Sequence, residues 1–96
     1  MTHKVKFKKW NCIIEKGEYD NGRVALELIG AKDGDRILVA TVNIPSEKLK
    51  EGEVIIKNYS ENEGVLDALI KAKIVSPPIR SVSSSYINAP ICKLLI

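Results

Sequence analysis

The sequence predicts an α+β domain in which an antiparallel sheet of five or six short strands carries one helix packed on one face. Several short runs alternate apolar and polar residues between turn sequences, as half-buried strands do. One later stretch spaces its apolar residues as a helix does. The chain has 96 residues, enough for one hydrophobic core, so we expect a single domain over residues 1–96.

The first strands are expected near the N-terminus, where apolar residues alternate with lysines. The alternation changes parity at Lys8–Lys9, which indicates a bulge or a break between two strands. Asn21–Gly22 then predicts a hairpin, because both central residues of a type I′ turn need positive φ. Residues 23–30 place their apolar side chains on one face and form the next strand.

Further strands are expected on both sides of the helix. Residues 36–44 are apolar on both faces, which is typical of a central covered strand, and Pro45 ends the run. Residues 53–57 form another short strand, and the segment from Ile79 onward is strand-like again. A single helix leaves one sheet face or an edge such as 53–57 or 91–96 open, so we expect a homo-oligomer.

The helix is expected to begin at Ser60. Ser60 and Glu63 match the capping box, in which a hydroxyl and a carboxylate satisfy amides of the first turn. Apolar residues then recur at helical spacing as far as Ile74, and Pro77–Pro78 stops the helix.

The composition speaks against most enzyme chemistry. The only histidine, His3, lies two residues from the N-terminus, where chains are usually frayed. No other histidine can serve as the base of a serine–histidine or cysteine–histidine arrangement. Cys12 and Cys92 are far apart and lie in apolar contexts, which predicts buried thiols rather than a zinc site. The glycines match no phosphate-binding motif. We therefore expect a protein that is not an enzyme and that has no cofactor and no metal.

Charge is unevenly distributed along the chain. The net charge is +3, but residues 1–16 carry +4, residues 17–70 carry −5 and residues 71–96 carry +4 without any acid. A face built from both ends would attract phosphates or an acidic protein surface. The ends and the middle could equally neutralise each other in the fold.

Six residues are candidate ligand contacts. One guanidinium, two hydroxyls and a phenol lie between two prolines, and an arginine fork suits phosphate or carboxylate: Arg80, Ser83, Ser84 and Tyr86. The alternative for this segment is a solvated serine-rich hairpin. Tyr59 and Asn62 could add an aromatic wall and an amide, although a helix cap and a hydrophobic staple explain that segment as well.

The N-terminal lysines form a further candidate surface. Lysines beside Trp10 fit a nucleic acid, yet lysines that alternate with Val5 and Phe7 are also how an edge strand avoids aggregation. The edge strand is the favoured interpretation, because the chain has few arginines.

Several segments carry a family resemblance. NGRVALELIGAKDGD, ATVNIP, YSENEGVLDAL, AKIVSPPIRSV and the closing PICKL together cover about residues 19–95. They resemble a family of small uncharacterised proteins from Gram-positive bacteria, their phages and conjugative elements. The resemblance implies a phage or mobile-element accessory protein, a setting in which counter-defence proteins are common.

Two mechanisms compete in that setting. The first is a sponge that sequesters a nucleotide second messenger, such as a cyclic oligonucleotide or a cyclic ADP-ribose. The second is a protein–protein inhibitor of a host defence nuclease, of the anti-CRISPR type, which would use the acidic middle segment. A nucleic-acid-binding accessory protein is a third, less favoured possibility. Without a secretory h-region or a bilayer-spanning run, we expect a soluble protein of the host cytoplasm without a membrane partner.

Overall fold

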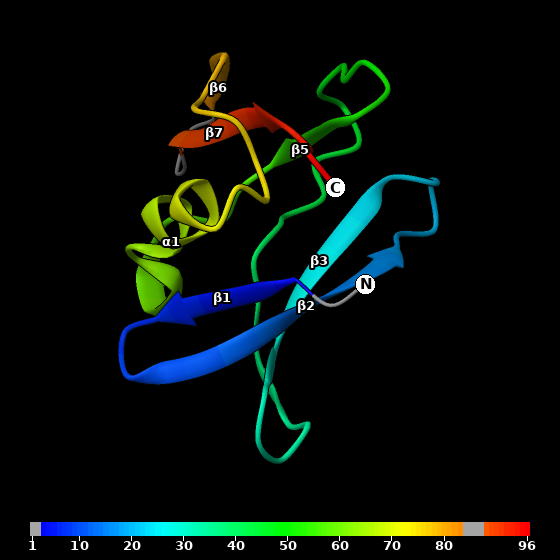
Figure 1. Cartoon of the computed structure of the whole chain (residues 1–96). Helices are drawn as coiled ribbons and strands as arrows, with labels where there is room; N and C mark the ends of the chain where they lie inside the picture. Colours follow the sequence, from blue (N-terminus) through cyan, green and yellow to red (C-terminus); the bar gives the residue numbers. More distant parts are fainter. Residues whose placement is uncertain (1–2, 84–87) are drawn as a thin grey trace.

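The computed structural model describes residues 3–83 and 88–96, and it contains two antiparallel sheets and one α-helix (Figure 1). The first sheet has the order β1-β2-β3-β4, with strands β1 (Lys4–Phe7), β2 (Trp10–Glu18), β3 (Val24–Gly30) and β4 (Arg36–Val39). The second has the order β5-β7-β6, with strands β5 (Glu53–Ile55), β6 (Arg80–Ser83) and β7 (Asn88–Lys93). A 3-10 turn, η1 (Ser60–Asn62), precedes the helix α1 (Val65–Lys71). The α+β class is confirmed.

The expectation of one sheet with five or six strands is wrong, because the chain divides its strands between two sheets. The segment 36–44 is not one covered strand. Beyond the end of β4 the Ala40 amide still donates to Leu26 O at 2.7 Å, but the Val42 amide donates to Ile55 O at 3.0 Å. The segment therefore leaves the first sheet and joins the second, where Thr41 bridges Ile56.

The edges expected to be free for a second copy are largely paired. β7 lies between β5 and β6, so segment 91–96 is central and not an edge over the length of β7. On the other side of β5, the Lys57 amide donates to Ala40 O at 2.8 Å. In the first sheet, β1 and β4 are the edge strands.

Both predicted breaks in the N-terminal strands are confirmed. β1 and β2 are joined by Lys8–Lys9, and Phe7 pairs with Trp10 across this two-residue turn. Lys8 has φ 53°, which is unusual for a residue with a side chain. The hairpin at Asn21–Gly22 also forms, although Tyr19 N–H donates to Arg23 O around a longer loop than a type I′ turn.

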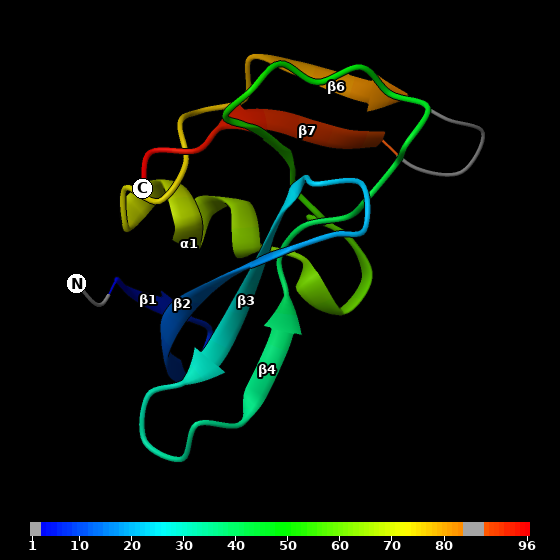
Figure 2. The same cartoon turned by 90° about the vertical axis from the view of Figure 1, so that its right-hand side faces the viewer.

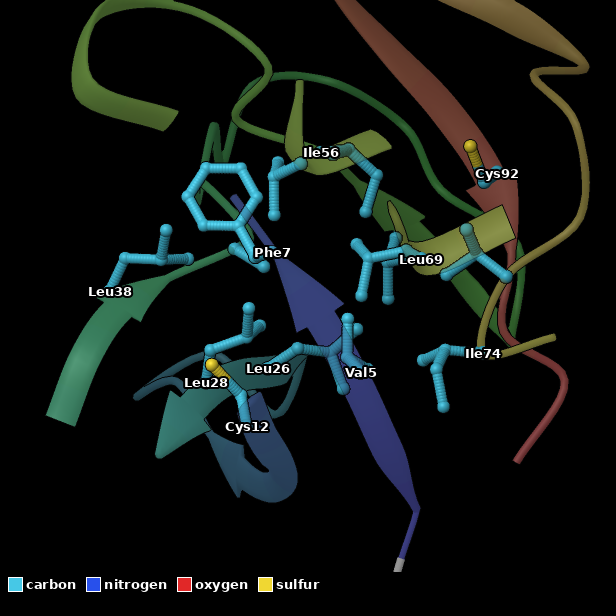
Figure 3. Close-up of a cluster of buried hydrophobic side chains, with 14 residues drawn as sticks. Val5, Phe7, Cys12, Leu26, Leu28, Leu38, Ile56, Leu69, Ile74 and Cys92 are labelled. Atoms are coloured by element: carbon cyan, nitrogen blue, oxygen red, sulfur yellow. The ribbon is translucent and has the colours of Figure 1, made fainter. Parts of the chain in front are cut away.

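The main core lies between the first sheet, α1 and residues in and beside β5 and β7 of the second sheet. Figure 2 shows α1 between the second sheet and the β1 end of the first sheet. Figure 3 shows side chains from all three parts pointing toward one another, among them Val5, Phe7, Leu28, Ile56 and Leu69. Cys12 and Cys92 are free and buried in this cluster, as predicted. Burial raises the pKa of both thiols, that of Cys92 to about 11.

The predicted capping box is wrong. Ser60 begins η1 with φ 55°, and α1 starts only after Gly64, which is left-handed at φ 95°. Asn58 caps the helix in place of Ser60, because its Oδ1 accepts from the amides of Gly64 at 3.1 Å and Leu66 at 3.0 Å.

The helix also ends earlier than expected. Lys73 adopts φ 61° and donates its amide to Ile70 O at 3.0 Å, while the Ile74 amide donates to Leu69 O at 2.9 Å. These two bonds form a Schellman motif, with buried Ile74 packed in the same core as Leu69. The chain thus leaves the helix before it reaches the prolines.

Candidate ligand-binding site

Arg80, the expected anion-binding residue, is hydrogen-bonded to other groups of the protein. Its Nη1 donates to Glu53 Oε2 at 2.9 Å and its Nη2 to Glu53 Oε1 at 2.7 Å. Nη2 also donates to the carbonyl of Lys48 at 3.1 Å. This is the bidentate geometry that an arginine fork prefers. The Arg80–Glu53 pair joins β6 to β5, the two outer strands of the second sheet, across β7.

The Arg80–Glu53 pair has a clear electrostatic signature. Glu53 is 8% exposed, and its Oε1 also accepts the Lys50 amide at 2.8 Å. The hydrogen bonds from Arg80, followed by the one from Lys50, lower the pKa of Glu53 to about 2. The same pair raises the pKa of Arg80. In this structure Arg80 ties β5 to β6, and its fork is not free for a ligand while the pair holds.

Of the other residues expected to bind a ligand in the Arg80 segment, only Ser83 lies within the described part of the chain. Ser83 ends β6, where it pairs with Asn88 of β7. Ser84 and Tyr86 lie outside the described residues.

Asn62 is buried rather than presented to a ligand. It is 1% exposed, and its Nδ2 donates to the carbonyl of Val39 at 2.7 Å. Its Oδ1 has no hydrogen-bond partner among residues 3–83 and 88–96. The side chain thus connects η1 to the last residue of β4.

Tyr59 lines a hollow of about 500 Å³ that runs beside β4, and we call it the Tyr59 hollow. One wall is the segment from β4 to the crossover, and the others come from the β2–β3 loop and from the chain after β5. Its lining residues are Tyr19, Arg36, Ile37, Leu38, Val39, Thr41, Val42, Asn43, Lys57, Tyr59 and Glu61. Of the expected contacts within residues 3–83 and 88–96, Tyr59 alone belongs to this lining.

Two cations lie in the Tyr59 hollow. Lys57 Nζ is 2.6 Å from Glu61 Oε1 and 5.8 Å from the centre of the Tyr59 ring. The hydrogen bond with Glu61 raises the pKa of Lys57 and lowers that of Glu61, so both stay charged near neutral pH. The Arg36 side chain is 62% exposed, and its Nη1 is 3.9 Å from Glu27 Oε2, at the long limit of an ion pair. Breaking such an exposed pair costs little free energy, so Arg36 can turn toward a ligand.

The opposite wall of the Tyr59 hollow is held by hydroxyl groups. Tyr19 Oη and Thr41 Oγ1 are 2.9 Å apart and share a hydrogen bond. Thr41 Oγ1 also accepts the amide of Leu26, which anchors it to β3. Two phenols, two cations, the Glu61 carboxylate, a hydroxyl and the amide of Asn43 therefore surround one space.

Sequence reasoning did not find Tyr19, Arg36, Thr41 or Lys57. The sequence patterns at these positions predict turns and strands. They do not predict which distant segments come into contact. The four residues come together because the crossover at residues 40–42 brings the end of β4 beside the chain after β5. The alternation of Lys57 and Tyr59 in one extended segment was the one available signal, since it places both side chains on the same side.

The structure supplies no metal cluster and no membrane helix within its described part. No three histidine, cysteine, aspartate or glutamate side chains gather as a metal site there. Within the same residues no helix combines the length and the apolar character needed to cross a membrane. A scan against protein-family models and searches of curated proteins and of solved structures found no match.

Proposed function

We propose that the protein acts by holding a ligand rather than by catalysis, and that the ligand is a small nucleotide-derived anion bound in the Tyr59 hollow. One observation carries the proposal: Tyr19, Tyr59, Arg36 and Lys57 line the same hollow of about 500 Å³. A pocket of this size takes a small organic ligand.

The residue types match the parts of a nucleotide. A phenol ring offers a flat face for a base, and stacking on an aromatic side chain contributes about 1–3 kcal/mol per base. Arg36 supplies charge for phosphates and can bind two oxygens at once, and Lys57 adds charge when it leaves its 2.6 Å ion pair with Glu61. Asn43 offers the N–H groups of its side-chain amide to ribose oxygens.

The biological setting of this proposal comes from the family resemblance. In a phage or a mobile element, a protein that sequesters a cyclic oligonucleotide or a cyclic ADP-ribose would deprive a host immune effector of its signal. The Tyr59 hollow is formed by one chain, so binding there does not depend on the expected homo-oligomer.

A thermal-shift screen against cyclic dinucleotides, cyclic trinucleotides and cyclic ADP-ribose tests the proposal. A ligand present at about 100 times its dissociation constant stabilises the folded protein by about 2.7 kcal/mol. Positive ligands are then measured by calorimetry with Arg36→Gln and Tyr59→Leu, and with Lys93→Gln as a control for the loss of one exposed cation. We expect the two hollow variants to lose affinity and the control to keep it.

The proposal fails if none of these ligands stabilises the protein, or if Arg36→Gln and Lys93→Gln bind equally well. In the first case a pull-down with host defence proteins tests the protein–protein inhibitor. A steep loss of DNA or RNA affinity with increasing salt would instead support the nucleic-acid alternative.

A further inference from the structure

We propose that the space between β1 and α1 binds an extended acidic segment of a partner protein, which adds to β1 as a further strand. This site is separate from the proposed nucleotide site, because β1 and β4 are opposite edges of the first sheet. We call the space the lysine trough.

The open edge of β1 follows from its pairing register. Ile14 N–H donates to His3 O at 2.9 Å, so hydrogen-bonded pairs fall at His3 and, two residues on, at Val5. The backbone N–H and C=O groups of Lys4 and Lys6 therefore point away from β2. β1 has no other strand beside it in the described chain, so these groups are free to bind a peptide backbone.

The lysine trough consists of two hollows that follow one another along β1. The larger, about 510 Å³, is lined by Lys4, Val5, Lys6, Asn11, Cys12, Ala31, Ala68, Lys71 and Ala72. The smaller, about 220 Å³, is lined by Lys6, Phe7, Lys8, Glu63, Gly64, Asp67, Ala68 and Lys71. They share Lys6, Ala68 and Lys71, so one trough runs from Lys4 to Lys8 with α1 as its far wall. Figure 1 shows α1 alongside β1, on the side away from β2.

The two ends of the lysine trough differ in width. Near Phe7 the helix comes close, since a Cβ atom placed on Gly64 would lie 3.9 Å from the Phe7 ring. Near Lys4 the larger hollow is wider: it reaches over β1 to Asn11 and Cys12 of β2, with the small side chains of Ala68 and Ala72 on its α1 side. Because α1 closes the edge of β1 at the Phe7 end, we place the added strand at Lys4 and Lys6, where the outward backbone groups are.

Charge identifies the occupant. The wide end carries the ammonium groups of Lys4, Lys6 and Lys71 and no acid, while Glu63 and Asp67 stand only at the narrow end. Carboxylates of an extended peptide would pair with these lysines, and its apolar side chains would lie on the alanines. The free backbone groups favour a peptide over a nucleic acid, because a nucleic acid has no backbone amides to extend a sheet.

The direct test uses an acetylated and amidated pentapeptide of alternating glutamate and valine. Fluorescence polarisation measures its binding to the whole protein, and amide chemical shifts report where it binds. We expect binding, shifts at Lys4, Lys6 and along α1, and little binding of the same peptide with lysine in place of glutamate. Equal binding of both peptides, or shifts elsewhere, would overturn the proposal.

The charge on the protein is tested with the double variant Lys4→Glu/Lys6→Glu. Lys48→Glu/Lys93→Glu is the matched control, since it makes the same change in net charge at exposed lysines outside the lysine trough. We expect the first pair to weaken binding by about tenfold or more and the second to have a far smaller effect. Thermal melting confirms that both remain folded.

Strand addition itself is tested on the peptide, which leaves the protein unchanged. In an added antiparallel strand, alternate amides face β1 and the others face away. N-methylation of one alternate set should abolish binding, and N-methylation of the other set should be tolerated. If both methylated peptides bind as well as the parent, or if native mass shows β1 closed in a dimer of this chain, the proposal is wrong.

Discussion

The two edges of the first sheet have the same role in the sheet but different surroundings. Beside β4, the chain itself crosses into the second sheet, and Asn62 takes up the carbonyl of Val39. Beside β1, the backbone groups of Lys4 and Lys6 pair with no strand of the described chain, lysine side chains flank them, and α1 packs against the Phe7 end. The comparison shows two ways to protect an edge strand, by covering it and by charging it. We propose a small ligand beside the covered edge and an extended peptide beside the charged one.

The largest effect is expected from uncovering β4. Asn62→Leu leaves the part-buried Val39 carbonyl without its donor, and this should cost about 1 kcal/mol of unfolding free energy, the low end of the range for a buried group. Lys6→Leu at the open edge should change that free energy by less than about 0.5 kcal/mol, because Lys6 is exposed. Urea denaturation compares the two. Equal losses would mean that the edges are not protected differently.

The Arg80–Glu53 pair that ties β5 to β6 in the second sheet should show in the pH dependence of stability. The folded pKa of Glu53 is about 2, below its ordinary 4.5, so the pair with Arg80 stabilises the fold above that ordinary value. This contribution is lost as pH falls from 4.5 toward 2. At neutral pH, Glu53→Gln should lower the melting temperature by several degrees, and its difference from the wild type should shrink in acid. A difference that is constant with pH would contradict the assignment.

The two proposed sites should respond to separate substitutions. Arg36→Gln should weaken nucleotide binding about tenfold, the effect of losing a charge-assisted contact, and leave peptide binding unchanged. Lys4→Glu/Lys6→Glu should do the opposite. Calorimetry with both ligands on both variants measures this. If one variant impairs both ligands, the two edges are not independent.

The smallest effect is expected at the turn that leads from β1 into β2. Lys8 has φ 53°, a conformation that costs a residue with a side chain more than it costs glycine. Lys8→Gly should therefore stabilise the protein by about 0.5–1 kcal/mol. Lys9→Gly, at the neighbouring position without positive φ, is the control and should not stabilise. Thermal unfolding of both variants measures the difference.

Local signals predicted much of the fold because they depend on neighbouring residues. The parity change at Lys8–Lys9 and the turn at Asn21–Gly22 separate strands where the structure does. The helix boundaries were missed for a local reason too: Asn58 and Ser60 are both good caps, and Lys73 stands where a glycine would have marked the end. The choice between such competing signals is made by packing.

The candidate site was far less predictable. Tyr59 lines the Tyr59 hollow, but Arg80 and Asn62 were chosen for chemistry that their surroundings use internally. Whether a guanidinium is free depends on a carboxylate 27 residues away in the sequence. No spacing within the Arg80 segment contains that information.

The amino-acid sequence by itself determined the α+β class, most of the strands and the burial of both cysteines, because periodicity and turn residues act over a few neighbours. The tertiary structure decided that the strands form two sheets, that Arg80 is tied to Glu53, and that Tyr19 and Tyr59 share a hollow. These features depend on contacts between distant segments. Such contacts are selected by the free energy of packing the whole chain, which no local pattern records.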